Sequence, residues 1–266
     1  MTEAPHLLEE EDQGVFIVTL NRPEKLNALS DQMMALFEQA VLKFRDTPEL
    51  KVMLIQAKGR FFSSGADLKE IKRPPPQTGS AIREVHRVQM RRMHYIYDEM
   101  EAIEKPIVAA HQAACVGGGL EMSMSCDFRL AAKSASYAFP EGKFGLLPAS
   151  NGVSRLTRLV GTQWARYLVM ANLPINAERA LMIGLVHDVF PDETFEQEVM
   201  AFCRHLAQQN GEQMGCAKLA IEMAADLGLA QARNVERMAN STLMLHPKYQ
   251  EYWTKHLETI GKNNKP

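Results

Sequence analysis

The 266-residue sequence has few cysteines, no long apolar run and almost no net charge. Its four cysteines are widely spaced and form no CxxC pair: Cys115, Cys126, Cys203 and Cys216. We therefore expect reduced thiols in the core of a cytosolic protein. The acidic N-terminal stretch MTEAPHLLEEED has no apolar run of the secretory kind, and no segment reaches the ~20 apolar residues of a membrane span. These absences predict a cytoplasmic location.

Several common enzyme motifs are also missing. The chain contains no GxSxG, HExxH or GxxxxGK[ST] pattern, and its eight histidines form no ligand-like cluster, so we expect no metal. His111, next to a predicted buried strand, is expected to be a packed or hydrogen-bonded core residue. The net charge of -2 gives no general reason to expect nucleic acid. The one candidate patch is a basic stripe made of Arg83, His86, Arg87, Arg91, Arg92 and His94. Such a stripe is more typical of a solvated or subunit-contacting helix face.

The composition, with 46% hydrophobic and 23% charged residues, is that of a globular protein able to bury a sizeable core. Apolar runs predict strands at 14–20, 51–57, 107–110, 128–132 and 186–190, after a loosely held tail at 1–12. Ser30 is a good N-cap for the first helix, and further helices are predicted at 80–103, 163–170 and 177–183. The proline-rich segment 73–80 is expected to form a loop that could serve as a lid. The chain becomes wholly helical after about residue 192.

The most informative stretch runs from Lys105 to Gly161. A buried strand leads into three glycines at 117–119, and a short apolar helix then carries Glu121. Glycines let a ligand approach the backbone, and the first turn of a helix presents unpaired N–H groups. Because Gly118 and Glu121 are three residues apart, they share a helix face, where a carboxylate would lie near an oxyanion donor. The alternative is that the glycines only permit tight packing and Glu121 caps or pairs locally.

Taken together, the motifs of this stretch resemble the signature of the enoyl-CoA hydratase/isomerase (crotonase) superfamily. That signature contains a KPxxAA strand, a GGG turn, a Glu-bearing helix, a CD-x-R strand, a P-E pair and a G-x-x-P loop, and all are present in order. RFFSSGADLKEI at 60–71 resembles the other half of the family's oxyanion hole, and TLNRPEKLNALS at 19–30 resembles its coenzyme A segment. The resemblance covers about residues 14–260.

The resemblance implies an α/β fold, with a crotonase-like spiral core of repeated ββα units at 1–191. It implies that residues 192–266 form a helical region used in subunit packing of a homotrimer or a hexamer. It also implies an acyl-CoA substrate, so that coenzyme A belongs to the substrate and no separate cofactor is needed.

The resemblance further assigns roles to individual residues. The backbone N–H groups of Ala66 and Gly118 would form the oxyanion hole, while Glu121 and Glu141 would hold one water and exchange its protons. Residues implied in binding coenzyme A or the acyl group are Lys25, Leu26, Ala28, Ser64, Asp67, Leu68, Lys69, Gly117, Ser150 and Asn151. Members that only shift double bonds commonly lack a carboxylate at the position of Glu121, so hydration of a 2-enoyl-CoA is favoured.

The loop after Glu141 departs from the family pattern. It reads PASNGV at 148–153, where the family usually has P-G-x-G-G-T, and this makes a straight-chain fatty acyl substrate less secure. Over its whole length the chain is similar to bacterial methylthioacryloyl-CoA hydratases, which couple hydration to thioester hydrolysis in dimethylsulfoniopropionate demethylation. The alternatives are a general short-chain enoyl-CoA hydratase of fatty or aromatic acid degradation, an isomerase, an acyl-CoA hydrolase, and an RNA-binding relative that uses the basic stripe.

Overall fold

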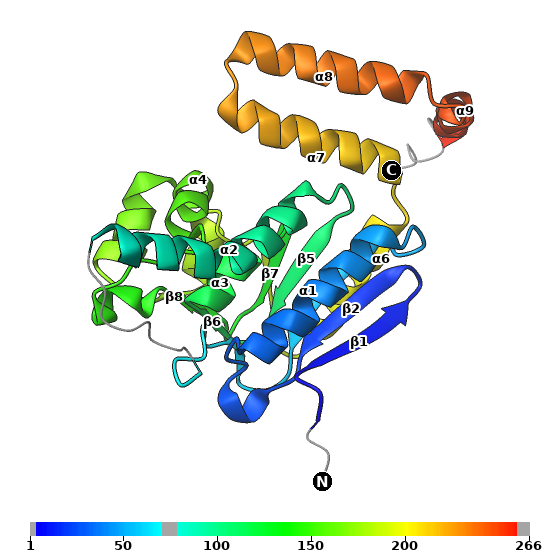
Figure 1. Ribbon diagram of the computed structural model, residues 1–266. Coiled ribbons are helices and arrows are strands. Elements are labelled where there is room, and N and C mark those ends of the chain that lie inside the picture. The colour runs from blue at the N-terminus through cyan, green and yellow to red at the C-terminus, as the bar shows by residue number, and fades with distance from the viewer. Residues whose placement is uncertain (1–3, 71–78, 260–266) are drawn as a thin grey trace. The chain divides into compact units, whose positions relative to one another are not determined.

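The computed structural model describes residues 4–70 and 79–259, which divide into two compact units between Gln208 and Gln209 (Figure 1). The predicted proline-rich loop at 73–80 lies, up to residue 78, outside the described residues. Of the basic stripe, the side chains of Arg83, Arg87 and His94 are described, and the first two are exposed. No helix in the described parts of the chain is both long and apolar enough to cross a membrane.

A six-stranded sheet forms the centre of the first unit, in the order β1-β2-β3-β5-β7-β10. Its strands are β1 (Leu7–Asp12), β2 (Val15–Leu20), β3 (Val52–Ala57), β5 (Ile107–His111), β7 (Phe128–Ala132) and β10 (Asp188–Phe190). Strands β2 to β10 pair in parallel, and β1 pairs antiparallel with β2. The prediction of a loose tail at 1–12 is therefore wrong. The strand was not predicted because LLEEED is highly charged. An edge strand can carry such charges on its exposed face.

A four-stranded sheet lies beside it, in the order β4-β6-β8-β9. Its strands are β4 (Phe61–Ser63), β6 (Ala114–Val116), β8 (Ser136–Ala138) and β9 (Ile175–Asn176). Each of β3, β5 and β7 is followed at once by β4, β6 or β8, so each repeat of the chain gives one strand to each sheet. Successive repeats step one place along both sheets, which is the repeated ββα arrangement expected from the resemblance. Because β4 and β6 are parallel neighbours, the segments that follow them meet at one edge.

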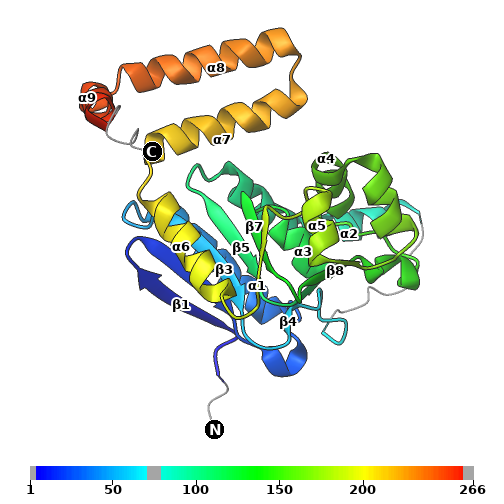
Figure 2. The ribbon, with the colours of Figure 1, turned by 180° about the vertical axis from the view of Figure 1, so that it is seen from behind.

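Helices cover both faces of the larger sheet. Helix α1 (Asp31–Asp46) lies on one face and α6 (Phe195–Ala207) on the other (Figures 1 and 2). The predicted N-cap of α1 is confirmed, since the Ser30 hydroxyl accepts a hydrogen bond from Met33 N at 3.1 Å. Helix α6 packs against β2, β3 and β7. For this reason the first unit extends through α6, beyond the boundary predicted at residue 191.

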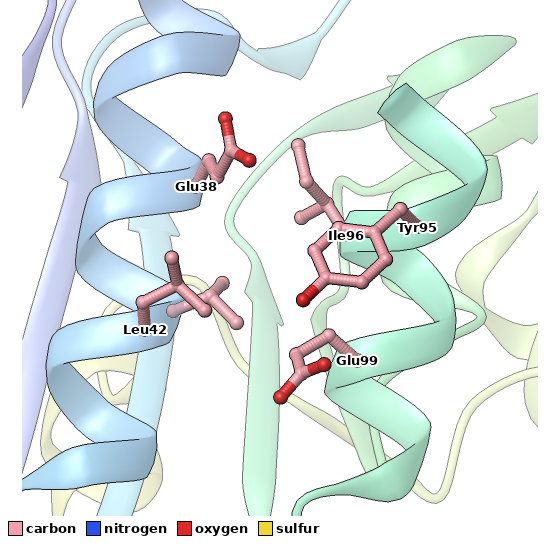
Figure 3. A pocket seen from close by; sticks show the side chains of 6 residues that line it. Glu38, Leu42, Tyr95, Ile96 and Glu99 are labelled. Atoms are coloured by element: carbon pink, nitrogen blue, oxygen red, sulfur yellow. The ribbon is translucent and has the colours of Figure 1, made fainter. Parts of the chain in front are cut away.

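The remaining helices of this unit surround the smaller sheet. They are η1 (Pro23–Lys25), α2 (Ser80–Ala102), α3 (Gly118–Ser123), η2 (Pro140–Phe144), α4 (Gly152–Ala165), the π-turn η3 (Arg166–Met170) and α5 (Ala177–Met182). A shallow hollow between α1 and α2 is lined by Glu38, Val41, Leu42, Tyr95, Ile96 and Glu99 (Figure 3). None of the residues implied in catalysis or binding lines this hollow.

The second unit consists of α7 (Gly211–Asp226), α8 (Leu229–Met244) and α9 (Tyr249–Thr259), of which α7 and α8 lie side by side (Figure 1). Only Gly215 and Ala232 are buried between residues 209 and 258 of the single chain. Large apolar side chains are exposed along the unit, including Leu219, Ile221, Leu229, Met238, Leu245 and Trp253. The unit therefore has little apolar core of its own.

Candidate active site

The amide of Ala66 lies in a loop that pairs with the segment preceding α1. Leu29 N donates to the Gly65 carbonyl at 2.8 Å, and Asp67 N donates to the Leu29 carbonyl at 3.1 Å. These bonds form a parallel bridge between Leu29 and Ala66. Because backbone polar groups alternate sides along an extended segment, the N–H of Ala66 is directed away from Leu29.

The glycine-rich turn after β6 meets this loop on that opposite side. A Cβ atom on Gly118 would lie 3.4 Å from Ala66 N, and one on Gly65 would lie 3.1 Å from Gly118 N. A Cβ atom on Gly119 would lie only 2.5 Å from Cβ of Ser63, so glycine is needed there for α3 to pack against β4. Gly118 is the first residue of α3, so its N–H has no carbonyl partner within the helix. Two neighbouring amides are thus placed where they can bind one carbonyl oxygen.

Glu121 stands on the same short helix and is 5% exposed. Its Oε1 accepts a hydrogen bond from Ser150 N at 2.8 Å, and the backbone N–H of Gly152, where α4 begins, also bonds to the carboxylate. Its Oε2 would lie 3.8 Å from a Cβ atom on Gly118. One oxygen is therefore held by the start of α4 while the other lies next to the Gly118 backbone.

The surroundings of Glu121 act on its protonation in opposite directions. Burial raises the pKa of Glu121 to about 7, and the nearby charge of Glu141 adds to this rise. The N–H groups of Ser150 and Gly152 and the guanidinium of Arg155 each lower the pKa but do not cancel the effect of burial. A carboxyl group with this pKa can both accept and release a proton near neutral pH.

Glu141, on η2, lies against the first glycine of the turn. A Cβ atom on Gly117 would lie 2.6 Å from Oε1 of Glu141, and Gly117 has a φ of 53°, which glycine adopts without strain. The Oε2 atom of Glu141 is buried and has no hydrogen-bond partner within the described residues. Burial raises the pKa of Glu141. A buried carboxyl oxygen without a protein partner is suited to bind water or a substrate atom.

Comparison with known proteins agrees with this geometry. The family model for enoyl-CoA hydratase/isomerase matches residues 10–264. The chain belongs to the enoyl-CoA hydratase/isomerase family. A probable enoyl-CoA hydratase of Mycobacterium tuberculosis is 32% identical over 87% of this chain and 86% of its own length. The 2,3-dehydroadipyl-CoA hydratase of Escherichia coli is 30% identical over 89% of this chain and 91% of its own length. A crystal structure of an enoyl-CoA hydratase subunit from Geobacillus kaustophilus has a TM-score of 0.87 at 28% identity, covering 96% of this chain and 95% of that one.

The residues of this chain that are implied in binding coenzyme A fall in two adjacent segments. Ser64 N donates to the Leu26 carbonyl at 3.0 Å, which ties the end of the 60–64 segment to the residues after η1. Lys25, Leu68 and Lys69 are exposed, whereas Ala28 and Asp67 are buried. Both lysines are therefore exposed on segments that the Ser64–Leu26 hydrogen bond joins.

Two residues implied in acyl binding make contacts within the protein. The backbone N–H of Ser150 bonds to Glu121, and Ser150 is 1% exposed. The side-chain amide of Asn151 donates to Asp98 of α2 at 3.1 Å. The contacts of these residues connect the loop before α4 to Glu121 on one side and to α2 on the other.

The sequence analysis missed Arg22, which holds the Ala66 loop in place. Arg22 is 8% exposed and donates from Nη1 to Asp67 at 2.7 Å and from Nη2 to Glu70 at 3.1 Å. Its Nη1 also reaches the Ala28 carbonyl at 3.3 Å. The NRP motif that carries Arg22 signals only the end of a strand, and nothing in the sequence pairs it with a residue 45 positions away.

Replacing Asp67 with asparagine is expected to reduce the free energy of unfolding by about 3 kcal/mol, because the buried Arg22 would keep only the half-exposed Glu70 as a charged partner. The Arg22 guanidinium lowers the pKa of Asp67, so this stabilisation is present above the unfolded pKa of about 3.9 and is lost as the pH falls through the folded pKa. Urea unfolding at pH 7 and pH 3 measures both effects. Asp12→Asn, which removes the partner of the exposed Arg204, is the matched control and should cost less than about 1 kcal/mol. An equal loss in both variants would contradict the prediction.

The other buried polar groups near the sheets are structural. His111 is fully buried, its Nδ1 lies 3.0 Å from the Tyr137 hydroxyl, and burial lowers its pKa to about 3, which confirms it as a packed core histidine. Cys115, Cys126 and Cys203 are buried free thiols, while Cys216 is half-buried. No group of three or more metal-ligating side chains occurs in the residues that the structure describes.

Proposed function

We propose that the chain catalyses hydration of a 2-enoyl-CoA thioester. The observation that carries this proposal is that two backbone amides, the buried Glu121 and the half-buried Glu141 lie around one glycine turn, at the edge where β4 and β6 end. The amides of Ala66 and Gly118 would bind the thioester oxygen as negative charge develops on it, each contributing on the order of 3 kcal/mol. Polarisation of the carbonyl makes the β-carbon electrophilic.

The two glutamates would then handle one water molecule. Glu121, in its ionised form, takes a proton from the water as its oxygen bonds to the β-carbon. Glu141, in its protonated form, delivers a proton to the α-carbon, so that one hydroxyl and one hydrogen are added across the double bond. Both groups have raised pKa values, and their interaction means that they titrate as a pair rather than singly. One carboxylate and one carboxylic acid can therefore coexist near neutral pH.

For the acyl group, we propose 3-(methylthio)acryloyl-CoA, with hydration followed by hydrolysis of the thioester. Support comes from the likeness of the whole chain to bacterial methylthioacryloyl-CoA hydratases and from the PASNGV loop, which differs from the usual family sequence. In the structure this loop is held to α2 through Asn151 and Asp98. The backbone of Ser150 in this loop binds Glu121, so a change of loop sequence bears directly on the acyl side of the site.

A panel of crotonyl-, cinnamoyl- and methylthioacryloyl-CoA tests both parts of the proposal. Loss of ultraviolet absorbance from the conjugated double bond measures hydration, and a thiol reagent measures release of coenzyme A. We expect bleaching with all three substrates, fastest by at least tenfold with methylthioacryloyl-CoA, and thiol release that follows bleaching only with that substrate.

Each alternative gives a different result in the same assay. Release of thiol from saturated butyryl-CoA would indicate a simple hydrolase. A rise in absorbance as a 3-enoyl-CoA becomes its conjugated 2-enoyl isomer, with no later bleaching, would indicate an isomerase. Faster bleaching of crotonyl-CoA with no thiol release would identify a general short-chain hydratase. Retention of an RNA probe with steep salt dependence, in the absence of bleaching, would favour the RNA-binding relative.

We also propose that the second unit packs against other copies of this chain, in a trimer or a pair of trimers, and that the protein is cytoplasmic. Its three helices expose large apolar side chains along their length, and such surface is usually covered in an assembly.

A further inference from the structure

The loop that binds Glu121 is itself anchored to α2. His94 donates from Nε2 to the Ala149 carbonyl at 3.0 Å, and Asp98, one helical turn later, accepts from the side chain of Asn151 at 3.1 Å. These contacts lie on both sides of Ser150, whose N–H bonds to Glu121. Helix α2 therefore fixes the position of a backbone donor to the carboxylate.

A third contact joins α2 to α4 itself through an ion pair in which the arginine is buried and its carboxylate partners are partly exposed. Arg155 is 8% exposed and bonds to both carboxylate oxygens of Glu101 through Nε and Nη2. Its Nη2 also donates to Asp98 at 3.0 Å. Burial lowers the pKa of Arg155, but the pairs with Glu101 and Asp98 outweigh burial and raise it, so the guanidinium stays charged. Such a bidentate pair fixes the guanidinium plane.

One nitrogen of the Arg155 guanidinium takes no part in these hydrogen bonds. Arg155 Nη1 is buried without a hydrogen-bond partner in the part of the chain that the structure describes, and the same is true of the Tyr97 hydroxyl. Tyr97 is fully buried on α2, and its pKa is raised first by burial and then by the charge of Glu121. Gly152, which binds Glu121, precedes Arg155 by three residues and so shares its helix face. Two unsatisfied donors thus lie in the buried region behind the carboxylate.

From this arrangement we infer that Arg155, held by Asp98 and Glu101 of α2, is a positioning residue that favours the ionised form of Glu121. The inference rests on the proposed role of Glu121 as the base. The titratable and charged groups that act on Glu121 or on its buried neighbours are Glu141 from η2, Tyr97 from α2, Arg155 from α4 and the Cys126 thiol. Of these, Arg155 is the only cation. The unsatisfied Tyr97 hydroxyl and Arg155 Nη1 are placed to share an ordered water, a common partner for buried polar atoms.

The test is the pH profile of kcat/KM in Arg155→Met and Arg155→Lys. The charge of Arg155 lowers the pKa of Glu121, so the acid limb of Arg155→Met should move to higher pH. The acid limb of Arg155→Lys should stay near the wild-type position because the charge is kept. Arg45→Met is the matched control, since Arg45 pairs with Glu99 of the same helix α2 but is not among the groups that act on Glu121.

A coincident acid limb in wild type and Arg155→Met, or an equal shift in Arg155→Lys, would overturn the inference. If Arg155→Met fails to fold, the double variant Glu101→Gln/Arg155→Met leaves only the largely exposed Asp98 carboxylate without its partner and should shift the acid limb in the same direction. The titration of Glu121 can also be followed without turnover by carboxyl carbon-13 NMR, with the signal assigned from Glu121→Gln. An enzyme inactive toward every enoyl-CoA with an unshifted NMR titration would fail both proposals, whereas inactivity with the expected shift would fail only the proposed function.

Discussion

Replacing Glu121 with glutamine is expected to lower kcat for hydration at least about 100-fold while leaving coenzyme A binding nearly unchanged. Glutamine is the same size, and its amide oxygen can still accept the hydrogen bond from Ser150 N. It cannot take a proton from water. The effect should therefore appear in the chemical step, measured as single-turnover loss of enoyl absorbance, and hardly in the dissociation constant for coenzyme A.

The same variant should be at least as stable as the wild type above neutral pH. Burial raises the pKa of Glu121 above its value in the unfolded chain, so ionisation of the folded protein lowers stability as the pH rises through about 7. Glutamine removes this cost. A thermal melt at pH 8 that shows unchanged or higher stability, together with lost activity, would separate a catalytic role from a structural one. Turnover near the wild-type rate would remove Glu121 from the mechanism.

Replacing Glu141 with glutamine is expected to cause a loss of similar size, at least about 100-fold, for a different reason. The Oε2 atom of Glu141 is buried without a hydrogen-bond partner among the described residues and would face the shared water. An amide at this position can still hydrogen-bond but cannot deliver a proton to the α-carbon. Exchange of the α-hydrogen of the product with deuterated water, followed by proton NMR, should therefore fall together with kcat.

The two variants should not be additive. If Glu121 and Glu141 act on one water, the double variant should be little slower than the worse single variant, because either loss already disables the shared step. Loss factors that multiply in the double variant would indicate that the two carboxyl groups act independently. Rapid α-hydrogen exchange in Glu141→Gln would exclude that residue as the proton donor.

Much of the fold and site could be predicted from local sequence. Four strands, β2, β3, β5 and β7, could be predicted from apolar runs, because strands covered on both faces are continuously apolar. The glycine turn with Glu121 is compact enough to be recognised within a few residues. The structure adds the spatial arrangement: the Ala66 amide lies next to Gly118 and Glu121, although the two segments are about fifty residues apart in the sequence.

What could not be predicted depends on contacts between distant segments. Strand β1 was missed because its exposed edge carries a run of acidic residues. The ion pairs of the buried Arg22 and Arg155 could not be predicted, because their partners lie 45 and 54 residues away. A single arginine in a sequence is usually interpreted as an exposed surface cation. The boundary at 191 was placed too early because the helical pattern of α6 does not reveal that it packs on the sheet.

The stepping of the two sheets has a consequence for how this scaffold can change over evolution. The amides of Ala66 and Gly118 come from short connections fixed by strand pairing, where a Cβ atom on Gly119 alone would collide with Ser63. After Glu141, by contrast, Phe144 at the end of η2 and Leu146 and Leu147 in the loop that follows are exposed. Substitutions at these exposed positions leave the paired strands and the glycine turn untouched, so the outer surface can diverge while the two amides keep their positions.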